Sequence, residues 1–288
     1  METWVFFSYT LVMSDGKSKK IAFLKMHGLG NDFVIIDARV NNISMRRDQI
    51  KKIGNRRFGV GFDQLAIIEA RQDVDAHLKF FNSDGSETST CGNATRCIAS
   101  YLMDELGQNM LKISTDFGML SALKHKTGEI SVNMGHPKLQ WNEIPLSAEV
   151  DTLRLPIDGE PVATSIGNPH CTFFVDNVDA VDLPNLGKEI EHHPIFPERA
   201  NVQFVSILGN DHLRVRVWER GVGITLSSGS SSCAAVVAAH RRKITGKNVK
   251  VDLDGGSLNV KWETDGIWIT GPTAHVFNGF FTKEFLEL

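Results

Sequence analysis

The alternation of apolar and polar residues predicts matching strands in the two halves of the chain. Leu78-Lys79-Phe80-Phe81-Asn82 and Val215-Arg216-Val217-Trp218-Glu219 both have the period-two pattern of a half-buried strand, and both end at a polar residue. They lie 137 residues apart (78 to 215), and the same offset separates Gly30-Asn31 from Gly167-Asn168. Ordered matches at one offset indicate an internal duplication.

A helix is predicted directly after each strand-and-loop segment. In the first half, apolar residues recur at helical spacing at Ala94, Cys97, Ile98, Tyr101 and Leu102. In the second half, residues 233 to 239 are small and apolar on all sides, which is typical of a helix enclosed by sheet. Cys91 and Ser228 precede these helices and are again 137 residues apart (91 to 228).

The duplication predicts two similar domains, each built of several strands around one principal helix. We place the first domain at residues 21–150 and the second at residues 151–288, after an N-terminal extension at residues 1–20. Met1 to Val12 are apolar, but Glu2 replaces the basic start of a signal peptide and the segment is too short to span a bilayer. The sequence is compatible with a functional start at either Met1 or Met13.

Composition and charge narrow the classes of partner. With 288 residues, 42% hydrophobic and 23% charged, the chain is long enough for two compact domains. A formal net charge of -3 without long Lys/Arg runs argues against nucleic acid or a membrane surface as the main partner. The four cysteines have no CxxC spacing, so we expect reduced thiols in a cytoplasmic protein and no metal site.

The two helix starts are the candidate reactive positions. A helix N-terminus can bind a carboxylate, and it can also lower the pKa of a cysteine toward neutrality. We expect this of Cys91, which lies in a polar loop, whereas Cys97 and Cys233 have the pattern of buried structural cysteines. Two opposed groups, one from each half, are what inversion of an amino-acid α-carbon requires, because one removes a proton and the other returns one to the opposite face.

Seven motifs, in this order along the chain, resemble the diaminopimelate epimerase family. They extend over almost the whole chain from about Phe23, and they are Gly28-Leu29-Gly30-Asn31-Asp32-Phe33, Gly61-Phe62-Asp63-Gln64, Phe81-Asn82-Ser83-Asp84-Gly85-Ser86, Cys91-Gly92-Asn93, Gly167-Asn168-Pro169-His170, Arg199-Ala200-Asn201-Val202 and Glu219-Arg220-Gly221. The family interconverts LL- and meso-diaminopimelate without pyridoxal phosphate. The resemblance implies an α/β fold of the α+β type, with two pseudo-symmetric domains, each a mostly antiparallel sheet or barrel wrapped around a central helix, and the active site in the cleft between them.

The resemblance also implies roles for individual residues. Cys91 would be one of two acid/base thiols, and Glu219, which would bind a substrate ammonium, would poise the site together with His170. The α-carboxylate would lie at the two helix starts, at Gly92, Asn93, Gly229 and Ser230. The distal end of the substrate would be held by Asn82, Asn168, Asn201 and Arg220, with Asn31 and Gln64 completing the pocket. Diaminopimelate would be the substrate, no metal or organic cofactor is required, and the protein would be a homodimer.

The chain departs from the family at the second thiol. The family has an Ala-Cys-Gly-Thr-Gly-like segment where this chain has Ser227-Ser228-Gly229-Ser230-Ser231, so Ser228 occupies the position of the thiol. A serine hydroxyl is a far weaker acid than a thiol, and no base stands next to it in sequence. Cys233 lies five residues further on, more than one helical turn away, and does not substitute for it. Ile224 similarly replaces a glutamate that many members have.

Three hypotheses are compatible with this departure. The first is a diaminopimelate epimerase in which Ser228 slows or disables inversion while Cys91 still exchanges the α-proton. The second is a non-catalytic diaminopimelate-binding protein. The third is a two-base racemase of another amino acid, which would not need Arg220 and its neighbouring asparagines to hold a second charged end.

Overall fold

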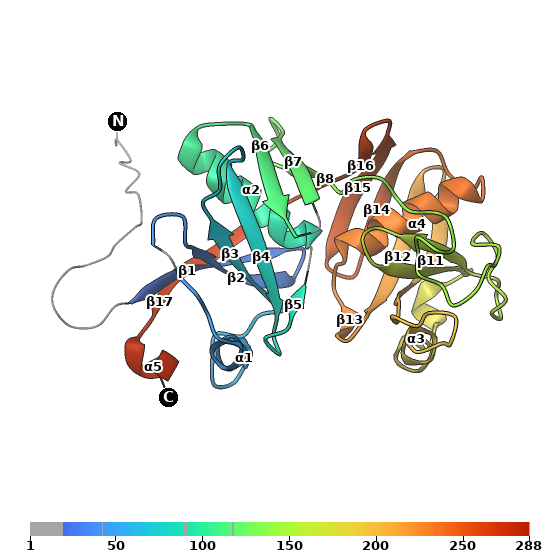
Figure 1. The fold of residues 1–288 in the computed structure, drawn as a ribbon. Helices are drawn as coiled ribbons and strands as arrows, with labels where there is room; N and C mark the ends of the chain where they lie inside the picture. The colour runs from blue at the N-terminus through green and yellow to red at the C-terminus, as the bar shows by residue number, and fades with distance from the viewer. Residues whose placement is uncertain (1–19, 42, 89–90, 117, 288) are drawn as a thin grey trace.

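The computed structural model describes residues 20–41, 43–88, 91–116 and 118–287. The extension expected at residues 1–20, apart from Lys20, lies outside them. Two halves stand side by side, each with strands around a helix (Figure 1). In the described part of the chain, no helix is long and apolar enough to cross a membrane.

The halves share one order of strands and α-helices, to which the second half adds a 3-10 helix, η1. The first half consists of β1 (Ile21–Gly28), β2 (Asn31–Asp37), α1 (Arg47–Gly54), β3 (Gln64–Glu69), β4 (Ala76–Asn82), β5 (Glu87–Thr88), α2 (Gly92–Leu106), β6 (Met110–Thr115), β7 (Gly118–Lys124) and β8 (Ile130–Asn133). The second half consists of β9 (Val162–Ser165), β10 (Pro169–Phe174), η1 (Val178–Ala180), α3 (Leu183–Glu191), β11 (Asn201–Gly209), β12 (His212–Glu219), β13 (Gly223–Thr225), α4 (Gly229–Arg241), β14 (Asn248–Leu253), β15 (Gly256–Glu263) and β16 (Gly266–Gly271), followed by β17 (Ala274–Phe281) and α5 (Lys283–Glu287).

Strand pairing repeats at the offset found in the sequence. Phe33 pairs with Gln64 between parallel strands β2 and β3, and His170 pairs with Asn201 between parallel strands β10 and β11. Each half then continues through an antiparallel pair, β3–β4 or β11–β12. The prediction of two pseudo-symmetric units with mostly antiparallel strands around a helix is therefore confirmed.

The two principal helices are enclosed because their side chains are small or apolar where the sheets cover them. On α4 every residue from Cys233 to Ala239 is buried, and on α2 the buried residues include Ala94, Cys97 and Ile98. Both helices contribute to one hydrophobic core and contact each other. Cys91 and Ser228 are the N-caps, and their side chains accept hydrogen bonds from the backbone N–H of Ala94 and Ser231, each at 3.4 Å.

The last strand pairs with the first strand of the first half. Residues 151–288 were expected to form the second domain, but β17 pairs antiparallel along β1, from Ile21 opposite Phe281 to His27 opposite Ala274 (Figure 1). The β1 strand already pairs with β2 on one side, so β17 satisfies its other row of backbone groups. Phe23 and Phe281 stack there with ring centroids 4.4 Å apart. The chain thus returns to the first half after completing the second.

Candidate active site

The starts of α2 and α4 lie against each other. A Cβ placed on Gly229 would stand 3.4 Å from Oδ1 of Asn93 and 3.1 Å from Cδ1 of Ile269, so a side chain at this position would require Ile269 to shift. The side-chain Nδ2 of Asn93 donates to the carbonyl oxygen of Ser227 at 3.2 Å and to Oδ1 of Asn31 at 3.1 Å. Hydrogen bonds therefore join the two helix starts across the halves.

A cavity of about 170 Å³ opens at these helix starts and is lined from both halves. It brings together thirteen of the fourteen predicted site residues: Asn31, Gln64, Asn82, Cys91, Gly92, Asn93, Asn168, Asn201, Glu219, Arg220, Ser228, Gly229 and Ser230. Most of them lie at strand ends or in the first turn of a helix. The polar strand ends and the helix N-termini thus face one cavity.

The asparagine wall of the cavity positions Arg220. Oδ1 of Asn201 accepts the backbone N–H of Arg220 at 3.0 Å, and Nδ2 of Asn201 donates to the carbonyl oxygen of Pro169 at 3.3 Å. The Arg220 guanidinium donates to the carbonyl oxygen of Glu198 at 2.9 Å. The hydrogen bonds of Arg220 thus go to an amide oxygen and a backbone carbonyl oxygen, and not to a carboxylate. The charge of its guanidinium is therefore available to an anion in the cavity.

Two buried oxygens in the cavity wall accept no hydrogen bond from the part of the chain that the structure describes. Oε1 of Gln64 and Oδ1 of Asn93 have no hydrogen-bond partner among the described residues. Because nearly all buried polar atoms in folded proteins are hydrogen-bonded, such acceptors are suited to a ligand that carries N–H groups.

His170, which was expected among the catalytic residues, does not itself line the cavity but contacts Asn168, which does. Its ring is fully buried, with Nε2 2.8 Å from Oδ1 of Asn168 and Nδ1 3.3 Å from Oε1 of Gln203. Burial lowers the pKa of His170 to about 3, so the ring is neutral at physiological pH. It stands behind Asn168 and holds that amide in place.

Cys91 differs from the sequence-based expectation in its acidity. Burial raises its pKa to about 12, and the negative charge of Glu219 contributes in the same direction. The hydrogen bond from the N–H of Ala94 opposes this rise but is smaller. The prediction that the helix start brings Cys91 toward neutrality is therefore wrong for this structure, because desolvation of the thiolate outweighs the helix N-terminus.

The fold supplies the base that Ser228 lacks in sequence. The Ser228 hydroxyl donates to Oε2 of Glu219 at 3.1 Å, and the Thr225 hydroxyl donates to Oε1 of the same carboxylate at 2.6 Å. Burial raises the pKa of Glu219; the two hydroxyl hydrogen bonds oppose the rise, and the charge of Asp63 adds to it. Glu219 and Ser228 thus form a buried pair able to share a proton.

Six further residues line the cavity without a role predicted from the sequence: Asp63, Glu87, Thr88, Met134, Val222 and Thr225. Asp63 is the most connected, because its Oδ2 accepts from Nδ2 of Asn31 at 2.8 Å and its Oδ1 pairs with Arg56 at 2.7 Å. The motif Gly61-Phe62-Asp63-Gln64 contains it, so the signal was present, although only Gln64 was assigned a role.

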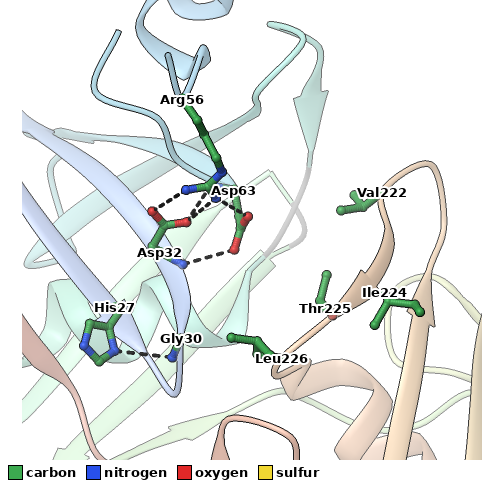
Figure 2. A pocket seen from close by; sticks show the side chains of 9 residues that line it. All are labelled: His27, Gly30, Asp32, Arg56, Asp63, Val222, Ile224, Thr225 and Leu226. Carbon is green, nitrogen blue, oxygen red and sulfur yellow. Dashed lines mark hydrogen bonds and ion pairs between the residues drawn. The ribbon is translucent and has the colours of Figure 1, made fainter. Parts of the chain in front are cut away.

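An outer hollow of about 380 Å³ adjoins the cavity and shares Asp63, Val222 and Thr225 with it. Figure 2 shows Arg56 placed between Asp32 and Asp63 on one wall, and apolar side chains of the second half on the other. The hollow is therefore the outer part of the same cleft. Across the described residues, no group of three or more His, Cys, Asp or Glu side chains could hold a metal ion.

Comparison with known proteins agrees with this geometry. The family model described as diaminopimelate epimerase matches residues 23–140 and 162–276. The chain is 44% identical to the diaminopimelate epimerase of Rhodospirillum centenum over 271 residues, which cover 92% of this chain and 93% of that protein. It is 45% identical to the diaminopimelate epimerase of Acidiphilium cryptum over 263 residues, covering 89% and 95%.

Solved structures with low sequence identity share the fold. A PhzF-family phenazine biosynthesis protein of Bacillus anthracis superimposes with a TM-score of 0.66 at 16% identity, covering 91% of this chain and 99% of that one. A hydroxyproline epimerase from Agrobacterium vitis gives 0.66 at 12% identity, covering 92% and 93%. From the family model and the identity to its members over nearly the full length, the chain belongs to the diaminopimelate epimerase family.

Proposed function

We propose that the protein is a diaminopimelate epimerase in which Ser228 slows inversion. The observation that carries the proposal is the contact between the starts of α2 and α4, which places Cys91 and Ser228 on one cavity from opposite halves. An amino-acid α-carbon between them has one acid/base group on each face. The family relatives support diaminopimelate as the substrate.

The two ends of the cavity suit the two ends of diaminopimelate. The free N–H groups in the first turns of α2 and α4 bind the reacting α-carboxylate, with Gly92 and Gly229 allowing close approach. The distal carboxylate binds Arg220, and the distal ammonium donates to side-chain oxygens of Asn82, Asn168 and Gln64. A substrate with a single charged end would leave Arg220 without a counter-ion, which disfavours racemisation of a monocarboxylic amino acid.

Proton transfer differs on the two faces. On one face Cys91, as a thiolate, removes the α-proton, exchanges it with solvent and returns it. Two helix N-termini at the carboxylate stabilise the carbanion, so the residues present supply the electrostatic stabilisation. On the other face the Ser228 hydroxyl can give its proton to the carbanion only when Glu219, whose pKa is raised by burial, is in its protonated form; Glu219 then passes its proton to Ser228 and is left as the carboxylate. This path is slow because a hydroxyl is a far weaker acid than a thiol, and for the same reason it is almost never ionised at neutral pH and so rarely supplies an anionic base.

Incubation in heavy water tests the proposal. LL- and meso-diaminopimelate are incubated separately, with deuterium at the α-carbon followed by mass spectrometry and the isomer ratio by chiral chromatography. We expect Cys91-dependent deuterium uptake that outpaces inversion. Tight binding without any exchange would instead identify a non-catalytic binding protein. Equal uptake in both isomers with fast inversion would show that Ser228 does not limit the reaction.

We further propose a homodimer in the cytoplasm. Among the described residues β17 pairs only with β1, so its other edge is open, and Val276, Phe277 and Phe280 on it are 45% to 55% exposed. An apolar edge strand of this kind favours association with a second copy. The four free cysteines, three of them buried, favour a reducing compartment.

A further inference from the structure

Arg96, in the second turn of α2, is a buried charge without a hydrogen-bond partner among the described residues. Its side chain has no solvent exposure, and Nε, Nη1 and Nη2 make no hydrogen bond to any described residue. A guanidinium carries five N–H donors and cannot be deprotonated under ordinary conditions. Leaving such a group buried and unpaired is costly, so its position calls for a physical reason.

The guanidinium lies beside the first turn of α2. Its Nη2 is 3.1 Å from the position that a Cβ on Gly28 would occupy, and that position is 3.5 Å from Cβ of Asn93. On the other side, Nε and Nη2 are 3.7 Å from the position of a Cβ on Gly271. Two glycines at strand ends therefore make room for Arg96 next to a residue that lines the cavity.

The duplication shows that this charge is present in one half only. The offset of 137 residues relates Arg96 to Cys233 on α4, and the two helices contact each other (96 to 233). The titratable groups that face Arg96 are the thiols of Cys91 and Cys97 on its own helix and of Cys233 on α4. Of these, Cys97 and Cys233 are fully buried, and only Cys91 lines the cavity.

We propose that Arg96 is a positioning residue for negative charge: its guanidinium, packed beside Gly28 and Gly271, stabilises the anion that forms at Cys91 and on the substrate during proton exchange. The inference rests on the proposed function for its chemistry. The anion that compensates Arg96 is the thiolate or the substrate, so the protein carries the positive charge in advance of the reaction.

The physical basis is electrostatic preorganisation. A charge in a desolvated site interacts with its neighbours far more strongly than in water, and it does so without reorganisation during the reaction. The charge of Arg96 already acts on Cys91 in the direction that favours thiolate, against the larger effect of burial and the charge of Glu219 from β12. Removing the charge should therefore make Cys91 harder to ionise.

The test measures the reactivity of Cys91 rather than turnover. Full-length native protein and the variants Arg96→Met, Arg96→Gln and Arg96→Lys are alkylated with iodoacetamide across pH 7 to 10, and the Cys91 peptide is quantified by mass spectrometry. For Met and Gln we expect a Cys91 reaction at least about tenfold slower at each pH, equivalent to one pKa unit, with thermal unfolding midpoints at or above the native value. Arg96→Lys keeps the charge and should remain within about threefold of native.

Two outcomes would overturn the inference. One is a Cys91 profile in Arg96→Met or Arg96→Gln that coincides with the native profile. The other is failure of both uncharged variants to fold, because that would make Arg96 a structural residue. Alkylation does not depend on diaminopimelate turnover. If deuterium exchange is absent but the Cys91 profile shifts as expected, the proposed function fails while the role of Arg96 in stabilising the thiolate remains.

Discussion

The hydroxyl of Ser228 donates to Oε2 of Glu219 at 3.1 Å, and this contact sets the chemistry available on one face of the cavity. Ser228 lines the cavity and is 3% exposed, while Glu219 holds a second hydroxyl from Thr225. The acidity of the side chain at position 228 therefore limits proton transfer on this face. Glu219 exchanges protons with that side chain and does not replace it.

Replacing Ser228 by cysteine should accelerate inversion. A thiol at this position restores the second acid/base group, so we expect a rise on the order of 10²-fold in the rate of interconversion, with substrate affinity nearly unchanged. The measurement is chiral chromatography of LL- and meso-diaminopimelate over time. The matched control is Ser228→Ala, which removes the hydroxyl and should invert more slowly than the native chain. Equal rates for the serine and alanine proteins would show that the hydroxyl transfers no proton.

The reactivity of Cys91 should rise steeply with pH. Because burial raises its pKa to about 12, the thiolate fraction increases about tenfold for each pH unit below that value. Alkylation of the native protein, followed at the Cys91 peptide, should therefore climb without a plateau between pH 7 and 10. Cys91→Ser serves as the control and should lose both the alkylated peptide and deuterium exchange. A plateau near pH 8 would contradict the assigned desolvation.

His170 should make the protein sensitive to acid. Its pKa is lowered to about 3 in the folded chain from an ordinary value of 6.5, so below 6.5 the unfolded chain binds a proton that the folded chain does not. Its contribution to stability is full above pH 6.5 and falls by about 1 kcal/mol per pH unit toward pH 3. Urea unfolding of the native chain and His170→Gln at pH 7 and 4.5 measures this, and the native chain should lose more stability than the variant. Parallel losses in both proteins would rule out His170 as the source.

Charging the exposed face of β17 should disrupt the proposed dimer. Phe277 is 45% exposed and packs edge-on against Phe23, with ring centroids 6.0 Å apart. We expect Phe277→Glu to sediment as a monomer in analytical ultracentrifugation while the native chain sediments as a dimer. The control is Ile207→Glu, another exposed apolar residue, 52% exposed, on the β11–β12 hairpin. Dimerisation that survives Phe277→Glu would place the interface elsewhere.

Much of the site could be predicted because it repeats. The offset between Cys91 and Ser228 matches the starts of α2 and α4, and polar residues at strand ends, such as Asn82 and Glu219, meet at the same cavity. These features are local: a strand ends, a glycine follows, and a helix begins. Local pattern and order along the chain were sufficient to place them.

Other features depend on tertiary contacts, which a local sequence pattern does not predict. The raised pKa of Cys91 comes from desolvation by the residues packed around it, and the proton acceptor of Ser228 is Glu219, at the end of β12. The burial of Arg96 could not be predicted either, since a charged residue on a helix is normally placed at the surface. The pairing of β17 with β1 likewise depends on which strand edge remains free once both halves have formed.

That pairing has a consequence for biosynthesis. As the chain leaves the ribosome, residues 21–133 emerge long before residues 274–281. One edge of β1 therefore stays unpaired while the second half is synthesised. During this interval the nascent chain exposes backbone donors, acceptors and the ring of Phe23. The first half therefore completes its sheet only after the second half has been made, and until β17 arrives β1 is an open edge to which another chain can pair.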